Sequence, residues 1–273
     1  MKAAEITRRS KSNLALAFVS LGREKRRDIT VFYAFCRVVD DIVDATDLTI
    51  PAKQEQLNSW RGWLRSGTPN EPGLAVDLRA VLERYAIPAK MPDEIITGVE
   101  MDLHKSTYAT FDELRFYCYH VASAVGLVSI EIFGYRNPAC REYAVQLGLA
   151  LQMTNIIRDV QKDLEKDRIY LPKEDLERFE YTEEELRQRR YNENFVRLME
   201  FEAERARGFF DRAAELLPHQ DRHAMVAAEI MGSVYRALLR RMEEDKFRVF
   251  EKEYRLNKLQ KAGRIAEQLW KSL

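Results

Sequence analysis

The chain has 273 residues, of which 46% are hydrophobic and 32% charged, and this composition excludes a disordered or fibrous protein. Its 44 basic and 44 acidic residues cancel, so the chain lacks the overall positive field of a nucleic-acid-binding protein, and we expect no nucleic-acid partner. Three cysteines without a CxxC pair favour a reduced, cytoplasmic setting and argue against a zinc site.

Apolar residues recur at helical spacing along most of the chain, and turns that contain Pro or Gly separate the helical segments. Alternating strand patterns, internal repeats and Ser/Gly-rich linkers are missing, so we predict one all-α domain over residues 1–273. In chain order, the predicted helices are 12–21, 24–46, 52–65, 73–86, 92–105, 112–134, 138–165, 183–188, 191–217, 222–249 and 251–270.

Two of these segments, 112–134 and 143–157, are apolar almost all round. Such helices belong in the middle of a bundle. A polar group on them must be paired or used, because an unpaired buried polar group costs about 1–3 kcal/mol.

The first polar constellation is the segment YAFCRVVDDIVD at 33–44. Tyr33, Arg37, Asp40 and Asp44 fall within a helical stripe about 60° wide, which places the two carboxylates roughly 6 Å apart. Two carboxylates at this separation repel each other unless a cation lies between them, and oxygen ligands suit Mg²⁺. The alternative is a solvated acidic turn, which the apolar residues around the motif disfavour.

The second constellation, QMTNIIRDVQKD, interrupts the most hydrophobic helix of the chain. Gln152, Asn155, Asp159 and Asp163 are spaced by 3, 4 and 4 residues and again form one stripe. Buried on such a helix, they need partners, which are either arginines or metal ions.

Taken together, the two motifs are more specific than either one alone. Each places an Asp-x-x-x-Asp ladder on a helix with an arginine nearby, Arg37 in the first motif and Arg158 in the second. This arrangement predicts a site in which several Mg²⁺ ions clamp a diphosphate while the guanidinium groups bind its remaining oxygens.

Five ordered blocks of the sequence resemble the squalene/phytoene synthase family, and together they extend over nearly the whole chain. They are SKSN at 10–13, YAFCRVVDDIVD at 33–44, FYCYHVASAVG at 116–126, LQMTNIIRDVQKD at 151–163 with RIYLP after it, and VYRALLRRMEEDKFRVF at 234–250.

The resemblance implies an isoprenoid-synthase helical bundle around a central cavity and a Mg²⁺-dependent prenyltransferase. It assigns two or three Mg²⁺ ions to Asp40, Asp44, Asn155, Asp159 and Asp163. It also places Tyr117 near the departing diphosphate. The residues that it assigns to diphosphate binding are Ser10, Ser12, Tyr33, Arg37, Arg158 and Tyr235, with Gln152 beside them.

The chain departs from the family pattern at three positions. Ser123 and Asp167 stand where glycine is usual, and Arg9 stands where some relatives carry histidine. These departures bear on chain-length preference and fine positioning more than on the class of reaction.

The implied reaction is the head-to-head (1′–1) condensation of two prenyl diphosphates with release of diphosphate. We expect two farnesyl diphosphates to give presqualene diphosphate, with NADPH required only if the reaction continues to squalene. The alternative is a phytoene synthase that joins two geranylgeranyl diphosphates. A non-catalytic scaffold with the same fold would show a damaged aspartate motif, and both motifs are intact here.

An allylic carbocation must be shielded from water, and aromatic faces can stabilise it without reacting. Tyr117 and Tyr119 are candidates, although Tyr119 also fits ordinary core packing. Ala122 and Gly126 lie four residues apart on the internal helix, a spacing that suits either a groove for prenyl chains or close helix packing.

The chain start lacks the apolar core of a signal peptide, and no uninterrupted apolar run approaches the roughly 18–20 residues that cross a bilayer. We therefore expect no transmembrane segment. The basic, amphipathic tail from Lys246 to Lys271 suits a solvated bundle helix or peripheral contact with a membrane surface. The sequence carries no signal for the oligomeric state.

Overall fold

The computed structural model describes residues 3–9 and 17–272, and within these ranges the regular structure is helical, with one isolated bridge between Thr107 and Ile169. The all-α prediction is confirmed. The elements are α1 Ala3–Arg9, η1 Phe18–Ser20, α3 Arg23–Asp44, α4 Ile50–Ser66, α5 Gly73–Arg84, α6 Lys90–Met101, α7 Phe111–Cys118, η2 Tyr119–Ser123, α8 Ala124–Phe133, α9 Ala139–Leu164, α10 Lys173–Arg178, α11 Glu183–Arg187, α12 Glu193–Leu216, η3 His219–Asp221, α13 Val226–Glu244 and α14 Lys258–Lys271.

Side-chain caps fix where several helices begin. Thr49, Thr110 and Asn192 each accept a hydrogen bond from a backbone N–H in the first turn of the following helix. Asn257 and Gln260 form a reciprocal capping box at the start of α14. These bonds satisfy backbone donors that a helix start otherwise leaves without a partner.

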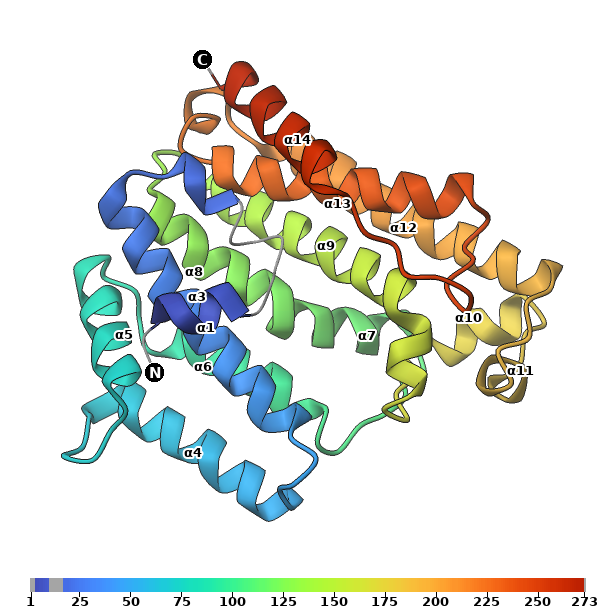
Figure 1. Cartoon of the computed structure of the whole chain (residues 1–273), viewed down its shortest axis with the longest axis horizontal. Helices are drawn as coiled ribbons and strands as arrows, with labels where there is room; N and C mark the ends of the chain where they lie inside the picture. The colour runs from blue at the N-terminus through green and yellow to red at the C-terminus, as the bar shows by residue number, and fades with distance from the viewer. Residues whose placement is uncertain (1–2, 10–16, 273) are drawn as a thin grey trace.

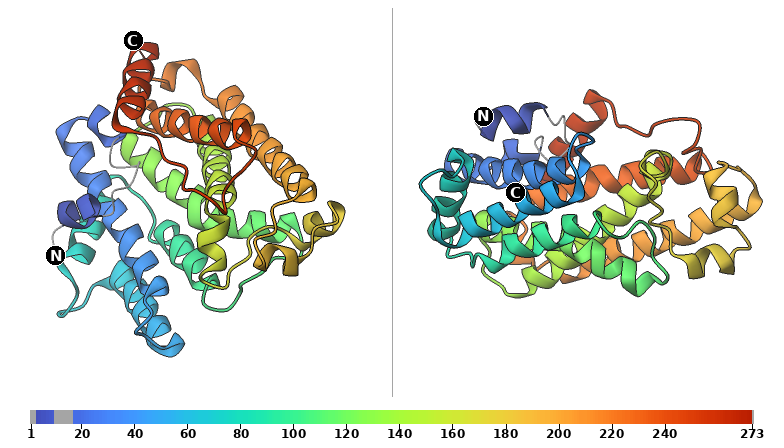
Figure 2. Two further views of the ribbon diagram at one scale, coloured as in Figure 1. Left: turned by 45° about the vertical axis from the view of Figure 1, so that its right-hand side comes forward. Right: turned by 90° about the horizontal axis from the view of Figure 1, so that it is seen from below.

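Helix α9 runs through the middle of the bundle and packs against α8, α12 and α13 (Figure 1). Its apolar residues Leu149, Ala150 and Ile157 are buried, as expected for an internal helix. The last helix, α14, lies along α13 on the outside of the bundle (Figure 2). Because α8, α12 and α13 pack around α9, the polar stripe of α9 lies inside the bundle.

The predicted helix 112–134 is continuous but contains a π-helical turn at η2, between α7 and α8. Close packing surrounds this turn, since a Cβ on Gly148 would lie 2.6 Å from the Cα of Ser123. The Ser123 hydroxyl donates a hydrogen bond of 2.8 Å to the carbonyl of Val145. The serine that replaces the usual glycine is therefore accommodated by a glycine on α9.

The prediction differs from the structure at the two ends of the chain and at α10. Helices α1 and α10 were not predicted, and most of the predicted helix 12–21 lies outside the described residues. Helix α13 ends at Glu244 because Lys246 and Phe247 adopt positive φ angles of 53° and 55°. The last helix begins at Lys258, after an extended segment, and not at residue 251.

One stretch among the described residues, Phe111–Phe133, is long and apolar enough to cross a membrane. The sequence prediction considered only uninterrupted apolar runs, and polar residues interrupt this stretch. Within the bundle, 61% of its most apolar part is buried. The core helix of a helical bundle has the same properties.

Candidate active site

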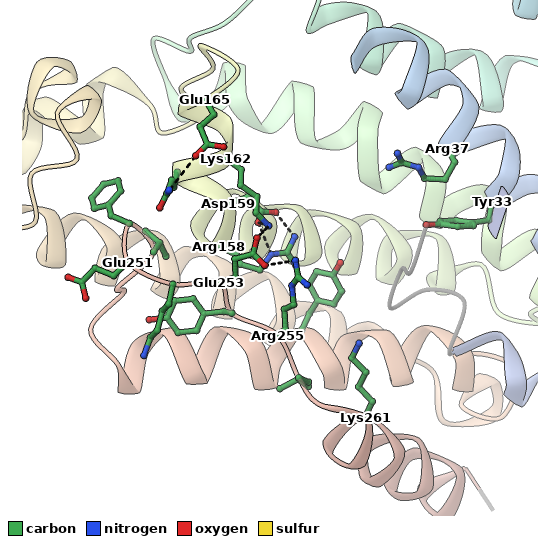
Figure 3. A pocket seen from close by; sticks show the side chains of 17 residues that line it. Tyr33, Arg37, Arg158, Asp159, Lys162, Glu165, Glu251, Glu253, Arg255 and Lys261 are labelled. Carbon is green, nitrogen blue, oxygen red and sulfur yellow. Dashed lines mark hydrogen bonds and ion pairs between the residues drawn. The ribbon is translucent and has the colours of Figure 1, made fainter. Parts of the chain in front are cut away.

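The two aspartate motifs line one cavity of about 410 Å³ between α3 and α9. Figure 3 shows how Tyr33 and Arg37 on α3 face Arg158 and Asp159 on α9. The residues that line this cavity are Tyr33, Cys36, Arg37, Asp40, Asp44, Ile95, Val99, Asp102, Tyr117, Val121, Val125, Gln152, Asn155, Ile156, Arg158, Asp159, Asp163, Arg168, Tyr170 and Tyr235.

The carboxylates of α3 differ in their partners. Arg37 donates a hydrogen bond of 2.9 Å to Asp40 and also pairs with Asp41. Burial raises the pKa of Asp40 to about 6, despite the nearby Arg37 guanidinium. Burial also acts to raise the pKa of Asp44, but hydrogen bonds from Lys166 at 2.7 Å and from Arg168 at 3.1 Å hold that pKa below its usual value.

On α9, Arg158 donates two hydrogen bonds to its neighbour Asp159. Burial, followed by the negative charge of Asp159, raises the pKa of Asp163 to about 7. A cation bound nearby would lower this pKa again, because an opposite charge favours the ionised carboxylate.

Asn155 provides the test of whether a metal ion fits this site. Its amide nitrogen donates a hydrogen bond of 3.2 Å to Gln152, but its buried amide oxygen has no hydrogen-bond partner in the described chain. An amide oxygen is a suitable Mg²⁺ ligand, and a bound ion would satisfy this atom.

Within the described residues, no three His, Cys, Asp or Glu side chains come close enough together to enclose a metal ion by themselves. The carboxylates instead form two separate sets on facing helices that border the same cavity. Mg²⁺ commonly takes only one or two protein carboxylates and completes its shell with water and phosphate oxygens. The arrangement therefore suits ions that bind together with a diphosphate.

Sequence reasoning missed a hydrogen-bonded group at one end of the cavity. Asp102, directly after α6, accepts hydrogen bonds from Tyr117 at 3.0 Å and from Tyr170 at 2.9 Å. The rings of Tyr117 and Tyr170 stack with their centroids 5.1 Å apart, and Arg168 lies 3.9 Å from Asp102. Tyr170 stands in the RIYLP block, but Asp102 lies in no motif, and no spacing in the sequence links the two residues.

An apolar pocket of about 160 Å³ adjoins the polar cavity. The two share Val121, Val125, Gln152, Asn155 and Tyr235, so the apolar space opens next to the polar stripe of α9. The other lining residues are Phe18, Ala122, Gly126, Ser129, Ile130, Phe133, Tyr143, Ala144, Leu147, Gly148, Leu151, Ala227, Ala228 and Met231.

Both interpretations of the small residues on the internal helix find support. Ala122 and Gly126 line the apolar pocket, and a Cβ on Gly126 would lie 3.0 Å from the backbone oxygen of Ala144. Tyr119 packs edge-on against His120 and is not among the residues that line either space. Tyr117 is therefore the aromatic candidate that reaches the cavity.

The structure brings all of the sequence-predicted site residues within its described part to this one cavity. Ser10 and Ser12 lie outside the described residues. Asp167, which replaces a usual glycine, has a φ angle of 56°, the left-handed conformation that glycine adopts most readily.

The family model described as squalene/phytoene synthase matches residues 7–261. The chain belongs to the squalene/phytoene synthase family. Among curated members, a phytoene synthase of Arthrospira platensis is 36% identical over 244 residues, which cover 83% of this chain and 78% of that protein. A phytoene synthase of Mycobacterium tuberculosis is 32% identical over 276 residues, which cover 98% of this chain and 89% of that protein.

Solved structures of squalene/phytoene synthases share the fold. A dehydrosqualene synthase in complex with a ligand superposes with a TM-score of 0.86 at 26% identity, over 99% of this chain and 96% of the other. A squalene synthase from Alicyclobacillus acidocaldarius gives a TM-score of 0.76 at 25% identity, over 90% of this chain and 93% of the other. The expected helical bundle of head-to-head prenyl synthases is confirmed.

Proposed function

We propose that this protein joins two molecules of geranylgeranyl diphosphate head to head to give phytoene, releasing two diphosphates, in a Mg²⁺-dependent reaction. The observation that carries the proposal is the polar cavity between the aspartate motifs of α3 and α9, which continues into an apolar pocket. A substrate with a charged head and a long hydrocarbon tail matches these two spaces.

The C20 substrate is supported by the curated relatives, which are named phytoene synthases at 32–36% identity. They favour this alternative over the farnesyl diphosphate that the sequence motifs led us to expect. Condensation of two farnesyl diphosphates is the second candidate, since a dehydrosqualene synthase gives a TM-score of 0.86. Phytoene formation ends with loss of a proton and needs no reductant, whereas formation of squalene would require NADPH.

The arginines and carboxylates have distinct roles in this proposal. Asp40, Asp44, Asn155, Asp159 and Asp163 would hold the metal ions. When bound, Mg²⁺ neutralises the negative charge that develops on the departing diphosphate. Because this charge increases as the C–O bond breaks, groups that bind it stabilise the transition state more than the ester.

Arg37 and Arg158 would bind the diphosphate oxygens, since their planar guanidinium groups can donate two hydrogen bonds at once. In the structure, Arg37 pairs with Asp40 and Asp41, and Arg158 pairs with Asp159. These ion pairs hold both guanidinium groups along the cavity wall.

The remaining wall would protect the carbocation. Tyr117 is buried and presents its ring where the polar cavity meets helix α7, while its hydroxyl is held by Asp102. Val121 and Val125 border both spaces and offer no nucleophile. Excluding water from this region prevents the cation from being quenched as an alcohol.

A reduced, cytoplasmic location also belongs to the proposal. Cys36, Cys118 and Cys140 are free thiols. Burial raises the pKa of Cys118 well above its usual value, which keeps its thiol protonated and unreactive.

A product assay tests the proposed function. Purified protein is incubated with geranylgeranyl or farnesyl diphosphate and Mg²⁺, with and without NADPH, and hydrocarbons and released diphosphate are measured. We expect a C40 product without NADPH. A C30 product from farnesyl diphosphate alone would establish the second candidate, and no condensation of either substrate would refute both.

The matched variants for this assay are Asp163→Asn and Asp167→Asn, which make the same carboxylate-to-amide change four residues apart, the first on α9 and the second in the turn after it. Asp163 borders the cavity, whereas Asp167 is exposed and pairs with Arg187. We expect the first to lower turnover at least a hundredfold and the second to leave it within about twofold, consistent with the loss of one transition-state charge contact.

A further inference from the structure

Helix α14 exposes its apolar side. The side chains of Leu259 and Trp270 are 84% and 79% exposed, and that of Leu269 is 39% exposed. Ala262 and Ala266, which lie between them on the helix surface, are also exposed. At 100° per residue these five positions fall within an arc of about 100°, so they form one continuous apolar face.

The opposite side of α14, which is polar, is the one turned toward the protein. Lys261, Arg264, Glu267 and Gln268 are half-buried, and Ile265 at the edge of the apolar arc packs against the core. A surface helix in a water-soluble bundle normally buries its apolar stripe and exposes its polar one. The inverted orientation of α14 therefore calls for an apolar partner outside the fold.

The segment before α14 anchors the helix in this orientation. Tyr254 and Leu256 are buried, and Tyr254 donates a hydrogen bond to Asp245 at the end of α13. Asn257 then caps the first turn of α14. The buried side chains of Tyr254 and Leu256 and the cap of Asn257 therefore fix the start of α14.

The charge of this region indicates the kind of partner. Residues 252–271 contain six basic and two acidic residues, in a chain whose net charge is zero. Lys258 is exposed beside the start of the apolar face and Arg255 is exposed just before it, whereas Lys271 lies on the polar side and pairs with Glu267. Each Lys or Arg near an anionic bilayer contributes about 1 kcal/mol of attraction, and Trp and Leu insert at the headgroup boundary.

A second copy of this chain fits the face less well. A helix of 14 residues offers a footprint of about 200 Å². A stable protein interface needs about 800 Å² per partner. The positive charges on this face would also repel their symmetry-related copies across a two-fold axis.

The position of α14 relative to the site favours a membrane as well. Lys261 and the extended segment from Phe250 to Leu256 line an opening of about 880 Å³, which they share with Arg37 and Arg158 (Figure 3). Lys261 belongs to the inward, polar side of α14, so the helix borders this opening while its apolar face points away from it.

We propose that α14 docks the protein on an anionic membrane surface, with Leu259, Leu269 and Trp270 inserted at the headgroup boundary and Lys258 beside lipid phosphates. In this position the helix that borders the site entrance lies on the bilayer, the phase in which a long-chain hydrocarbon product dissolves. The inference concerns the lipid surface alone and holds for either prenyl substrate.

Vesicle binding by the full chain tests the proposal. We expect it to co-sediment with phosphatidylcholine vesicles that contain 30% phosphatidylserine, to bind pure phosphatidylcholine vesicles at least tenfold more weakly, and to lose binding at high salt. The tryptophan emission should shift to shorter wavelength on binding, because Trp270 is exposed, whereas Trp60 is buried and Trp63 already packs against the core.

The double variant Leu259→Ser with Trp270→Ser should weaken vesicle binding at least tenfold while leaving the melting temperature unchanged. The control Val76→Ser removes an exposed apolar side chain from α5 and should bind vesicles like the original protein. Equal binding by the double variant, or no binding by the original protein, would overturn the proposal. So would a dimer that the double variant dissociates, since the apolar face would then be a protein interface.

Discussion

Tyr117 donates a hydrogen bond of 3.0 Å to Asp102, and this bond connects α7 to the end of α6 in the wall of the polar cavity. Asp102 also accepts a hydrogen bond of 2.9 Å from Tyr170 and lies 3.9 Å from Arg168. One carboxylate thereby fixes two stacked rings, so we regard Asp102 as a positioning residue for the aromatic wall.

We expect Asp102→Asn to lower kcat at least tenfold with little change in KM, because the amide cannot accept the two tyrosine hydrogen bonds as a carboxylate does. Steady-state kinetics together with a melting curve separate this effect from unfolding. Asp93→Asn, on α6 itself, is the control, since Asp93 pairs with Arg61 away from the cavity. An unchanged kcat in Asp102→Asn would show that hydrogen bonds to Asp102 are not needed to position the two tyrosine rings.

The motifs of α3 and α9 were predictable because a helical repeat of 3 or 4 residues places their polar side chains on one stripe. The contact between Asp102 and Tyr170 was not predictable, since the two residues come from separate segments and only the tertiary fold brings them together. The π-helical turn at η2 follows from packing against Gly148, and no periodicity records it.

The C-terminal region is a second place where the sequence pattern could not predict the tertiary arrangement. The sequence indicated an amphipathic helix there, but hydrophobic periodicity does not say which face turns inward. The burial of Tyr254 and Leu256 in an extended segment decided where α14 begins and how it is oriented.

A second prediction concerns the unpartnered amide oxygen of Asn155. Asn155→Leu keeps the side-chain volume but removes this acceptor, so we expect the Mg²⁺ concentration for half-maximal activity to rise at least tenfold. Asn155→Asp should retain a ligand oxygen and shift this value less. Gln146→Leu, on the same helix outside both spaces, is the control. Unchanged Mg²⁺ dependence in Asn155→Leu would remove Asn155 from the metal site.

A third prediction concerns the contact between α9 and the π-helical turn. A Cβ at position 148 would lie 2.6 Å from the Cα of Ser123, so Gly148→Ala should lower the free energy of unfolding by about 1–3 kcal/mol. Gly208→Ala on α12 meets no atom within 4 Å and should instead stabilise the protein by up to about 1 kcal/mol. Denaturant unfolding measures both, and equal stabilities would refute the close contact.

A fourth prediction concerns pH and the buried Glu202. Burial raises the pKa of Glu202 above its usual value of 4.5, although Arg205 donates a hydrogen bond of 2.6 Å to it. Asp175 shares the same arginine, and Cys118 lies close by. The folded state therefore binds a proton that the unfolded state releases, and the free energy of unfolding should fall as the pH rises above 4.5 toward neutral.

Glu202→Gln should flatten this dependence, whereas Glu204→Gln, two residues along and exposed, should preserve it. Urea unfolding between pH 5 and pH 8 measures the slope. An identical slope in Glu202→Gln and in the original protein would assign the dependence to other groups.

The central claim is that α3 and α9 together hold divalent ions with a diphosphate between them. The most direct measurement is a crystal structure with Mn²⁺ and an unreactive prenyl thiolodiphosphate, recorded at the manganese absorption edge. We predict anomalous peaks against carboxylates of both helices, at Asp40 or Asp44 and at Asp159 or Asp163, with the diphosphate between them. A bound analogue without metal in this cavity, or metal at one helix only, would contradict the claim.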